Sequence, residues 1–323
     1  MVVDQVMTNL SLVMPTYNKL PRLSLVLASL SRQTYPTHQW EVVIVDDGST
    51  DATSAYLDTF TPPFTLRRLC ADRTGRSAAR NRGLAHANFD VIVFLDDDVL
   101  LPPEFVAAHA AEQQNAPAVV HGRIVDLTAL KFFDDPSKGI FYPEFNSRSR
   151  SSSLLREACL TEQDVVEQFD RKVRTEQRTT AFESVIETVL TGRAPGPPWI
   201  GFTGGNVAVP KAWLMDAGRF DESFGLDWGC EDLELGYRLW LAGHPFRYSH
   251  ACVNYHLAHY RFRFDAEQAR TSSYFARKHD DGDIEILGEF IAGALSGKTL
   301  LERFRERRAS GAASDDHAGA ADQ

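Results

Sequence analysis

"VIVFLDDDVLLPPEF", residues 91–105, joins a run of five apolar residues to three consecutive aspartates. The apolar run 91–95 predicts a buried β-strand, because short continuous runs of this kind are typical of strands that are covered on both faces. Asp96, Asp97 and Asp98 end the strand. Adjacent carboxylates repel one another when they are unpaired, so this position requires a cation or hydrogen-bond donors nearby.

The N-terminal part of the chain repeats this pattern of an apolar strand followed by polar residues. Further strands are predicted at 10–15, 41–45 and 64–69, and helices at 20–33 (with Asn18 near its start), 51–57 and 75–87. The alternation predicts an α/β fold, with a mostly parallel sheet and helices on both faces. Ligands of such sheets bind beyond the carboxyl ends of the strands. The polar residues at 15–18, 46–47 and 96–98 are therefore expected to face one crevice.

Residues 126–198 interrupt this alternation and are predicted to form an insertion or lid. The insertion contains an aromatic, turn-rich stretch (130–145), a polar stretch (146–153), one or two charged helices (160–190) and a Pro/Gly linker (191–198). The alternation returns at 199–243. We expect one domain over 1–260, built from the halves 10–125 and 199–260, then a helical extension (261–308). Residues 309–323 have almost no bulky apolar side chain, which predicts a disordered tail.

Composition limits the class of protein. The chain has 323 residues, of which 43% are hydrophobic and 24% charged, as is typical of globular proteins. The net charge of -10 argues against a general nucleic-acid-binding protein. No signal-peptide pattern is present at the N-terminus, and no apolar run reaches the roughly 20 residues of a membrane span. We therefore expect a cytoplasmic protein. The basic, amphipathic segment 300–310 could be a solvated helix end, an oligomer contact or a peripheral membrane contact.

Two groups of residues could bind a divalent cation. Asp96 and Asp98, spaced as D-x-D at a strand end, suit Mg²⁺ or Mn²⁺, which take oxygen ligands. A capped or solvated turn before Pro102 is the alternative. His256 and His259 lie three residues apart, and either could be a metal ligand or a structural residue.

Two further motifs allow both a structural and a functional interpretation. "TGGN" (203–206) is either a tight turn or a place where a ligand approaches the backbone closely. Glu231, Asp232 and Glu234 fall in the first turn of a predicted helix, where the helix dipole stabilises carboxylates. The same environment would keep a general base ionised at neutral pH.

These motifs, in their order along the chain, resemble a known family. "LVMPTYN", "VIVDDGSTD", "GRSAARNRG", "FLDDDV", "FTGGNVAVPKA" and "GCEDLELGYRLW" are similar to the motifs of inverting GT-A-type glycosyltransferases of family 2. The stretch from "GGNVAVPKAWL" to "HLAHYR" also resembles polypeptide N-acetylgalactosaminyltransferases and chondroitin polymerases. The resemblance covers residues 10–125 and 199–260, and implies a GT-A fold for the domain.

The resemblance implies a role for each matching residue. On the nucleotide side, the pocket would be lined by Pro15, Thr16 and Tyr17, with Asp47 or Asp46 on the base, commonly uracil, and Arg76 near the ribose or diphosphate. On the reactive side, Asp96 and Asp97 would face the ribose and the metal, Asp98 and His256 (or His259) would bind Mn²⁺ or Mg²⁺, and Gly204 and Gly205 would border the donor sugar. Asp232 would be the catalytic base, with Glu231 as the alternative.

The implied activity is metal-dependent, inverting transfer of a hexose-type sugar from a nucleotide-diphosphate sugar, UDP-linked by preference. The acceptor hydroxyl could belong to a glycan, a glycolipid, a peptide or a small molecule, and a homo-oligomer is possible. A sugar-nucleotide nucleotidyltransferase is one alternative, although such enzymes usually carry a Gly-rich basic loop where this chain has "MPTYNKLPR". A non-catalytic sugar-nucleotide-binding protein is the other. A dinucleotide-dependent dehydrogenase is disfavoured, because no G-x-G-x-x-G follows the first strand.

Overall fold

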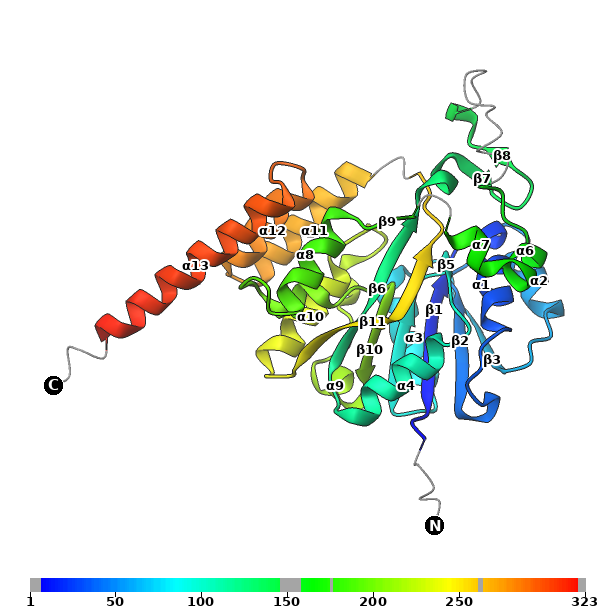
Figure 1. Cartoon of the computed structure of the whole chain (residues 1–323), viewed down its shortest axis with the longest axis horizontal. Coiled ribbons are helices and arrows are strands. Elements are labelled where there is room, and N and C mark those ends of the chain that lie inside the picture. Colours follow the sequence, from blue (N-terminus) through cyan, green and yellow to red (C-terminus); the bar gives the residue numbers. More distant parts are fainter. Residues whose placement is uncertain (1–6, 146–157, 175–176, 261–263, 319–323) are drawn as a thin grey trace, which may run out of the picture.

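The computed structural model describes residues 7–145, 158–174, 177–260 and 264–318 of the chain. Within these residues a nine-stranded sheet is covered by helices on both faces, and a group of C-terminal helices lies at one end (Figure 1). The strands of this sheet are β1 (Leu10–Thr16), β2 (Trp40–Asp46), β3 (Thr65–Cys70), β4 (Val91–Leu95), β5 (Val99–Leu100), β6 (Val119–Leu127), β9 (Gln177–Arg178), β10 (Asn206–Pro210) and β11 (Phe246–His256). β7 (Phe133–Asp135) and β8 (Ile140–Phe141) form a separate hairpin.

The helices fall into three groups along the chain. Around the main sheet lie α1 (Leu20–Leu30), α2 (Thr53–Thr59), α3 (Arg76–His86), α4 (Phe105–Asn115), α9 (Lys211–Asp216) and α10 (Glu231–Leu241). The predicted insertion contributes α6 (Glu162–Glu167), α7 (Phe169–Val173) and α8 (Ala181–Leu190). The C-terminal group is α11 (Phe264–Lys278), α12 (Gly282–Ile291) and α13 (Gly297–Ala318).

The order of the strands brings several of their ends to one edge of the sheet. The order is β3-β2-β1-β4-β10-β6-β11-β5, and β1 runs parallel to both β2 and β4. The antiparallel strand β10 pairs Asn206 with Leu95, so it starts where β4 ends. The carboxyl ends of β1, β2 and β4 therefore share an edge with the loop that precedes β10. The predicted α/β fold with a mostly parallel sheet is confirmed.

The core lies on both faces of the central strands. Side chains alternate between the faces of a strand, so Val93 packs with α1 and α4 on one face, whereas Ile92 and Phe94 pack with α3, α9 and α10 on the other. All three are fully buried. Burial of each such side chain stabilises the fold by roughly 1.5–3 kcal/mol. This two-sided burial explains why the strands are continuously apolar in sequence.

The start of α1 at residue 20 agrees with the prediction, but its N-cap and its end do not. The helix begins at Leu20 with Lys19 as its N-cap, and it ends at Leu30. Asn18 instead adopts φ 50°, and its side-chain oxygen accepts hydrogen bonds from the backbone N–H groups of Thr50 and Asp51. Asn18 therefore ties the end of β1 to the loop after β2.

The predicted insertion is more finely divided than expected and shares the core of the molecule. In place of one or two helices, its described part holds α6, α7 and α8, and β9 pairs with β6. Val185 and Ile186 of α8 pack with Trp199 and the C-terminal helices. Whether part of it acts as a lid stays a prediction, and its polar stretch (146–153) lies outside the described residues, as do residues 154–157.

The C-terminal end also differs from the prediction. α13 continues as a helix through Ala318, into the segment 309–323 that was expected to be disordered. The reason is compositional, because this segment is rich in alanine, the residue with the highest helix propensity. Residues 319–323 lie outside the described part.

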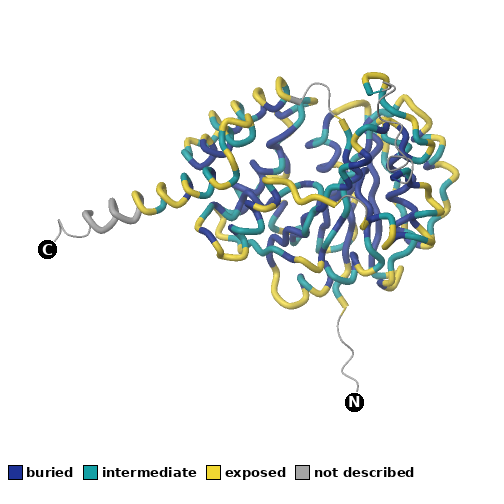
Figure 2. The backbone as a smooth tube through the Cα atoms, turned by 45° about the horizontal axis from the view of Figure 1, so that its top comes forward, coloured by how far each residue is buried: buried dark blue, intermediate teal, exposed yellow. Residues whose placement is uncertain are grey.

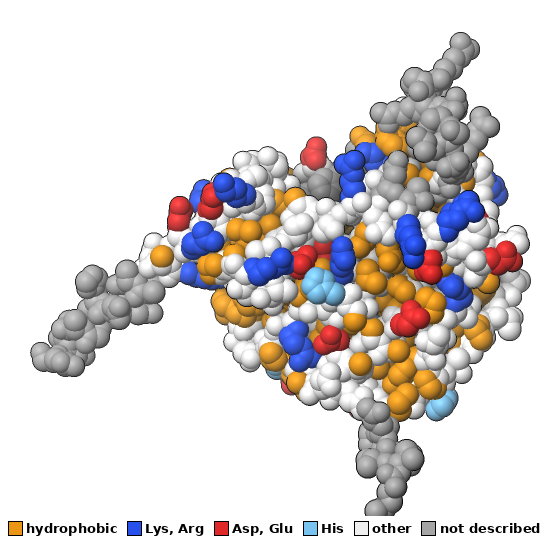
Figure 3. All heavy atoms as spheres, in the orientation of Figure 1, with side chains coloured by type: hydrophobic (Ala, Val, Ile, Leu, Met, Phe, Trp, Pro, Cys, Tyr) orange, Lys and Arg blue, Asp and Glu red, His pale blue; other side chains and the backbone are white. Residues whose placement is uncertain are grey.

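The surface carries no helix suited to a bilayer, as far as the described residues go: none is both long and apolar enough to cross one. On the face shown in Figure 3, basic and acidic side chains are interspersed.

Candidate active site

The polar ends of neighbouring strands contact one another at this shared edge. Thr16, the last residue of β1, donates a hydrogen bond of 2.6 Å from its hydroxyl to Asp97 Oδ2 after β4. Lys19 Nζ lies 3.5 Å from Asp98 Oδ2. The predicted residues of the first and fourth strands therefore lie in one site.

Asp47 and Tyr17 lie beside the loop that leads into α3. The buried Asp47 carboxylate accepts hydrogen bonds from Thr74 N (2.6 Å) and Gly75 N (2.9 Å). The Arg73 guanidinium lies 3.6 Å from the centre of the Tyr17 ring. The Asp46 carboxylate instead accepts a hydrogen bond of 2.9 Å from Ser49 N, in the loop that follows β2. Pro15 precedes Thr16 in β1. The residues predicted to line the nucleotide pocket therefore lie next to one another, at the ends of β1 and β2.

Asp97 and Asp98 are both buried, but their pKa values are shifted in opposite directions. Burial, and next the charge of Asp98, raise the pKa of Asp97 to about 7. Burial alone would raise the pKa of Asp98 as well, but the charges of His256 and Lys19 outweigh it and hold that pKa well below its usual range. Asp98 is therefore the carboxylate of this pair that stays ionised.

Asp98, His256 and His259 form a cluster suited to a metal ion. Their ligand atoms all lie within 4.8 Å of one another. His259 Nε2 is 3.0 Å from Asp98 Oδ2, and His256 Nε2 is 3.6 Å from Asp98 Oδ1. Asp98 Oδ1 is buried without a hydrogen-bond partner in the described chain. The spacing of the two histidines left them as alternatives, whereas in the structure both reach the same carboxylate.

Asp126, which sequence analysis missed, completes the surroundings of this cluster. It ends the pairing of β6 with β11, and its Oδ1 lies 2.9 Å from Nδ1 of His256. Burial would lower the pKa of His256, but Asp98 and Asp126 together raise it to about 9. A carboxylate on the outer nitrogen is the usual way in which a metal-binding histidine is oriented.

Arg80 connects the aspartate loop with the start of α10. Its side chain is 2% exposed; Nη1 donates to Glu231 Oε1 at 2.8 Å and Nη2 to Asp96 Oδ1 at 3.1 Å. Burial raises the pKa of Glu231, but the charges of Arg80 and Arg76 outweigh this and lower it. Arg76, the first residue of α3, thus acts on the same carboxylate through its charge. Apart from the position of Arg80 in the motif "GRSAARNRG", no local sequence pattern predicts these contacts.

Asp232 is held by the glycine loop before β10. Gly204 N donates to Asp232 Oδ2 at 3.0 Å, and Leu233 N donates to Oδ1 at 2.8 Å. Burial, and next the charge of Glu231, raise the pKa of Asp232 to about 6. The loop needs its glycines, because a Cβ on Gly204 would lie 2.5 Å from Arg80 Nη2 and one on Gly205 3.0 Å from Asp96 Oδ2.

Through these contacts the structure joins the predicted metal-binding and catalytic residues. Asp232 touches Gly204, the glycine loop packs on Arg80 and Asp96, and Asp98 follows two residues later. A carboxylate suited to proton transfer and a cluster suited to a cation therefore share one edge of the sheet.

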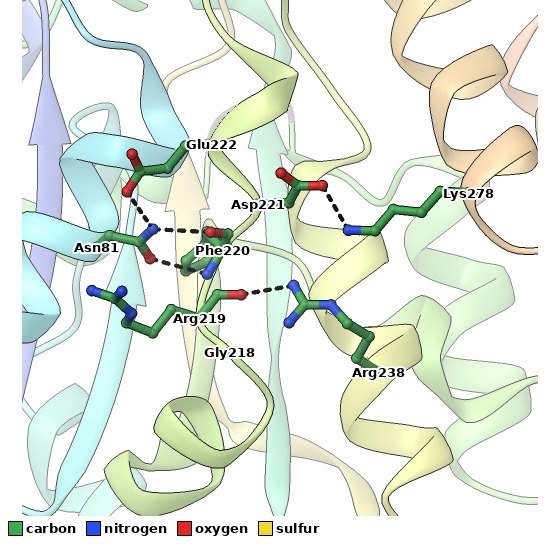
Figure 4. Close-up of a pocket in the computed structure, with 8 residues that line it drawn as sticks. All are labelled: Asn81, Gly218, Arg219, Phe220, Asp221, Glu222, Arg238 and Lys278. Carbon is green, nitrogen blue, oxygen red and sulfur yellow. Dashed lines mark hydrogen bonds and ion pairs between the residues drawn. The ribbon is translucent and has the colours of Figure 1, made fainter.

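A separate hollow of about 430 Å³ is lined by other residues (Figure 4). Its walls are Asn81, Gly218, Arg219, Phe220, Asp221, Glu222, Arg238 and Lys278. Lys278 Nζ is 2.6 Å from Asp221 Oδ2, and Asn81 Nδ2 donates to Glu222 Oε1 at 2.8 Å. Asp221, Glu222 and Lys278 thus find partners within the hollow, and none of the predicted site residues lines it.

Comparison with known proteins places the chain in a family. Residues 11–167 match the model of glycosyl transferase family 2. Validoxylamine A glucosyltransferase of Streptomyces hygroscopicus subsp. jinggangensis (strain 5008) is 31% identical over 308 residues, covering 92% of this chain and 67% of the relative. Chondroitin synthase of Escherichia coli is 29% identical over 258 residues, but this chain spans only 35% of it.

Solved structures share the fold. GalNAc-T7 with UDP, GalNAc and Mn²⁺ matches with a TM-score of 0.55 at 18% identity, over 94% of this chain and 55% of that one. Mannosyltransferase PcManGT from Pyrobaculum calidifontis, in complex with GDP-Man and Mn²⁺, matches with a TM-score of 0.53 at 18% identity, over 96% of this chain and 82% of that one. The chain is a glycosyltransferase with the GT-A fold, and it belongs to glycosyl transferase family 2.

Proposed function

We propose that the protein transfers a sugar from a UDP-linked nucleotide sugar to an acceptor hydroxyl, with a divalent cation and with inversion at the anomeric carbon. The observation that supports this most strongly is the link from Asp232, through Gly204 and the Arg80–Asp96 pair, to the cluster at Asp98. Tyr17, Arg73 and Asp47 would receive the nucleotide at the other end of the same edge.

The residues around Asp98 fit a divalent cation. The buried Asp98 Oδ1, which has no hydrogen-bond partner among the described residues, offers a ligand atom, and His256 and His259 offer two imidazoles. Two imidazole ligands suit a first-row transition metal better than Mg²⁺, which takes oxygen ligands. When bound there, the cation would supply positive charge that offsets the charge developing on the leaving diphosphate.

Asp232 is the better placed general base. The acceptor oxygen attacks the anomeric carbon as the bond to the diphosphate breaks, and the hydroxyl proton passes to the Asp232 carboxylate. A pKa of about 6 leaves this carboxylate largely ionised at pH 7 but still basic enough to take the proton. Glu231 is less suited, because Arg80 holds it in an ion pair of 2.8 Å. Attack from the face opposite the diphosphate inverts the anomeric centre.

Glucosyl transfer to a small hydroxylated acceptor is the first specific activity to test. Two relatives that align with 92% of this chain are named validoxylamine A glucosyltransferases. Glycan, glycolipid and peptide acceptors are the alternatives, because chondroitin synthases and hyaluronan synthase also align with the chain over 76–78% of its length.

The test is a donor panel with one catalytic variant. UDP-glucose, UDP-GlcNAc and GDP-mannose are incubated with the protein and Mn²⁺, and released nucleoside diphosphate is measured with and without hydroxylated acceptors. Asp232→Asn should lower kcat by roughly 10²- to 10⁴-fold, the usual contribution of a general base. Its donor-induced thermal shift should equal that of the wild type. Glu285→Gln, an exposed carboxylate on α12, is the control.

Three outcomes would each contradict part of the proposal. Normal turnover by Asp232→Asn would move the base role to another residue, with Glu231 the first to examine. Release of pyrophosphate in place of nucleoside diphosphate would indicate a nucleotidyltransferase. Adding EDTA should abolish turnover and Mn²⁺ should restore it; undiminished rates in EDTA would remove the metal role from Asp98.

A further inference from the structure

Four consecutive residues in front of the proposed catalytic pair are all held by one helix, α11. The four residues are Asp227, Trp228, Gly229 and Cys230, and their partners on α11 lie between 268 and 272. α11 lies outside residues 11–167, which match the family model. It also lies outside the motifs that carry the resemblance to the family. Its contacts with the turn before α10 therefore give it a role that the sequence does not suggest.

The turn before α10 has an unfavourable backbone conformation. Gly229 has φ 105° and Cys230 φ 64°, and Cys230 is the N-cap of α10 without a side-chain capping hydrogen bond. A non-glycine residue rarely adopts a left-handed conformation, and such strain persists only where the surrounding structure enforces it. The next two residues are Glu231 and Asp232, so the direction of this turn sets where both carboxylates point.

Gln268 is the residue that packs directly against this turn. Its side chain is 6% exposed. A Cβ on Gly229 would lie 2.7 Å from Gln268 Oε1, so the amide lies flush against the Gly229 backbone. Its Nε2 donates to Cys230 Sγ at 3.3 Å and to Ser272 Oγ at 3.3 Å. The buried Gln268 amide thus contacts both residues with positive φ, Gly229 and Cys230.

The remaining contacts hold the beginning of the turn. Thr271 Oγ1 lies 3.2 Å from the Trp228 carbonyl, to which it can donate. Arg270 pairs with Asp227 through two hydrogen bonds of 2.7 and 2.6 Å. The Arg270 and Asp227 side chains are 58% and 34% exposed, so solvent weakens this ion pair. Of the two buried residues, Thr271 holds the Trp228 carbonyl, whereas Gln268 contacts both Gly229 and Cys230.

We infer that Gln268 is a positioning residue for catalysis: it keeps the Gly229–Cys230 turn left-handed and so directs Glu231 to Arg80 and Asp232 to Gly204. The inference rests on the proposed function, because it assumes that Asp232 is the base. A shift of about 1 Å in a catalytic group can lower the rate 10²-fold, although ground-state binding of the donor is retained.

The experiment compares Gln268→Ala with Ser273→Ala, an exposed position on the same helix. The donor that turns over fastest in the panel above is used, well below the melting temperature of each variant. Gln268→Ala should lower kcat at least tenfold and change KM for the donor less than twofold, because the nucleotide-side residues are untouched. Ser273→Ala should match the wild type. Gln268→Met, which keeps most of the volume but not the N–H donor, should give a smaller loss of kcat with the same KM.

Cys230→Gly provides a rescue that a general structural defect would not show. Glycine adopts φ 64° without strain, so Cys230→Gly combined with Gln268→Ala should recover most of the lost kcat. A wild-type kcat in both Gln268 variants, or a double variant no better than Gln268→Ala, would overturn the inference. If Gln268→Ala does not fold, the Gln268→Met comparison decides. Asp232→Asn, assayed in parallel, separates the two proposals, since its normal turnover would refute the base assignment alone.

Discussion

Asp232 is the single group whose protonation the proposed reaction depends on most. Burial beside Glu231 raises its pKa to about 6, and only its ionised form can accept a proton. At saturating Mn²⁺ and donor, kcat should therefore be level above about pH 7 and fall about tenfold per pH unit below about pH 6. The measurement is kcat for the wild type and Glu285→Gln across this range.

The raised pKa of Asp232 also makes the stability of the folded protein depend on pH. Because the pKa of Asp232 is higher in the folded chain than in the unfolded chain, folding favours its protonated form. Ionisation therefore lowers the stability as the pH rises from about 4 through about 6. This cost suits a residue kept for reactivity rather than for stability. A kcat that stays level down to pH 5 would contradict the assignment of Asp232.

Asp126 offers a second prediction at the scale of one residue. Its carboxylate lies 2.9 Å from His256 Nδ1 and can fix the orientation of that ring. Asp126→Asn removes the charge but retains an oxygen, so the affinity for Mn²⁺ should fall about 10- to 100-fold, as for other outer-shell partners of metal ligands. Titration calorimetry with Mn²⁺ measures it, with Glu285→Gln as the control. Unchanged affinity would place the metal away from His256.

The aspartates at 46–47 and 96–98 were predictable from the sequence because they end apolar strands, and Asp232 because it lies in the first turn of a predicted helix. Arg80, Arg73 and Asp126 were not, because their importance arises from partners that are distant in sequence. Arg80 meets Glu231 across 151 positions of the chain, and no local pattern encodes such a pair. His259 was recognised but not resolved from His256, since spacing alone cannot show that both face Asp98.

At the scale of elements, the proposed site depends on two consecutive glycines, Gly204 and Gly205, in the loop before β10. The loop before β10 passes between α3 and α10, so Gly204 faces the Arg80 guanidinium while its N–H binds Asp232. Gly204→Ala would put a Cβ 2.5 Å from Arg80 Nη2. Because Arg80 is buried and paired on both sides, it cannot move aside without breaking an ion pair.

We therefore expect Gly204→Ala to lower kcat at least 10²-fold and to lower the melting temperature. Gly288→Ala is the matched control, since this helical glycine has nothing within 4 Å of the added methyl group. Gly288→Ala should leave kcat unchanged and stabilise the fold by roughly 0.5–1 kcal/mol. Assays of turnover and thermal unfolding measure both variants. Equal activity of the two would show that the loop tolerates a side chain.

Among the elements, the strands and helices up to β4 were predictable, because apolar runs and turn residues specify them locally. The orientation of β10 was not, because its pairing with β4 and β6 is decided by the chain that returns through the insertion. α8 is an example of how the insertion is held in place. Its Glu183 is 4% exposed and lies 3.0 Å from His121 Nε2 and 2.7 Å from the Tyr248 hydroxyl. These two contacts anchor the insertion to β6 and β11.

At the scale of the whole molecule, two distant parts of the chain contribute to the proposed site. The N-terminal strands supply Asp47 and Asp98, whereas the part after the insertion supplies Asp232 and His256. The C-terminal helices lie at one end of the sheet, and α13 runs outward from it (Figures 1 and 2). α11 packs against the Asp227–Cys230 turn, α12 and α13 pack together, and α13 contacts α8. The C-terminal helices α11–α13 are therefore part of the structure that supports the proposed site.

This arrangement predicts different effects for two C-terminal truncations. A chain ending at residue 296 loses Leu300 and Phe304, which are fully buried, and the pairs of Arg307 with Asp281 and Arg308 with Asp283, both 3.0 Å. Removing each large buried side chain costs about 2–5 kcal/mol, so together they approach the whole stability of a typical domain. This truncation should be unfolded or melt at least about 10 °C lower, whereas a chain ending at 310 should match the full chain in melting temperature and turnover. Circular dichroism on heating measures both, and equal melting of all three would show that α13 is not part of the core.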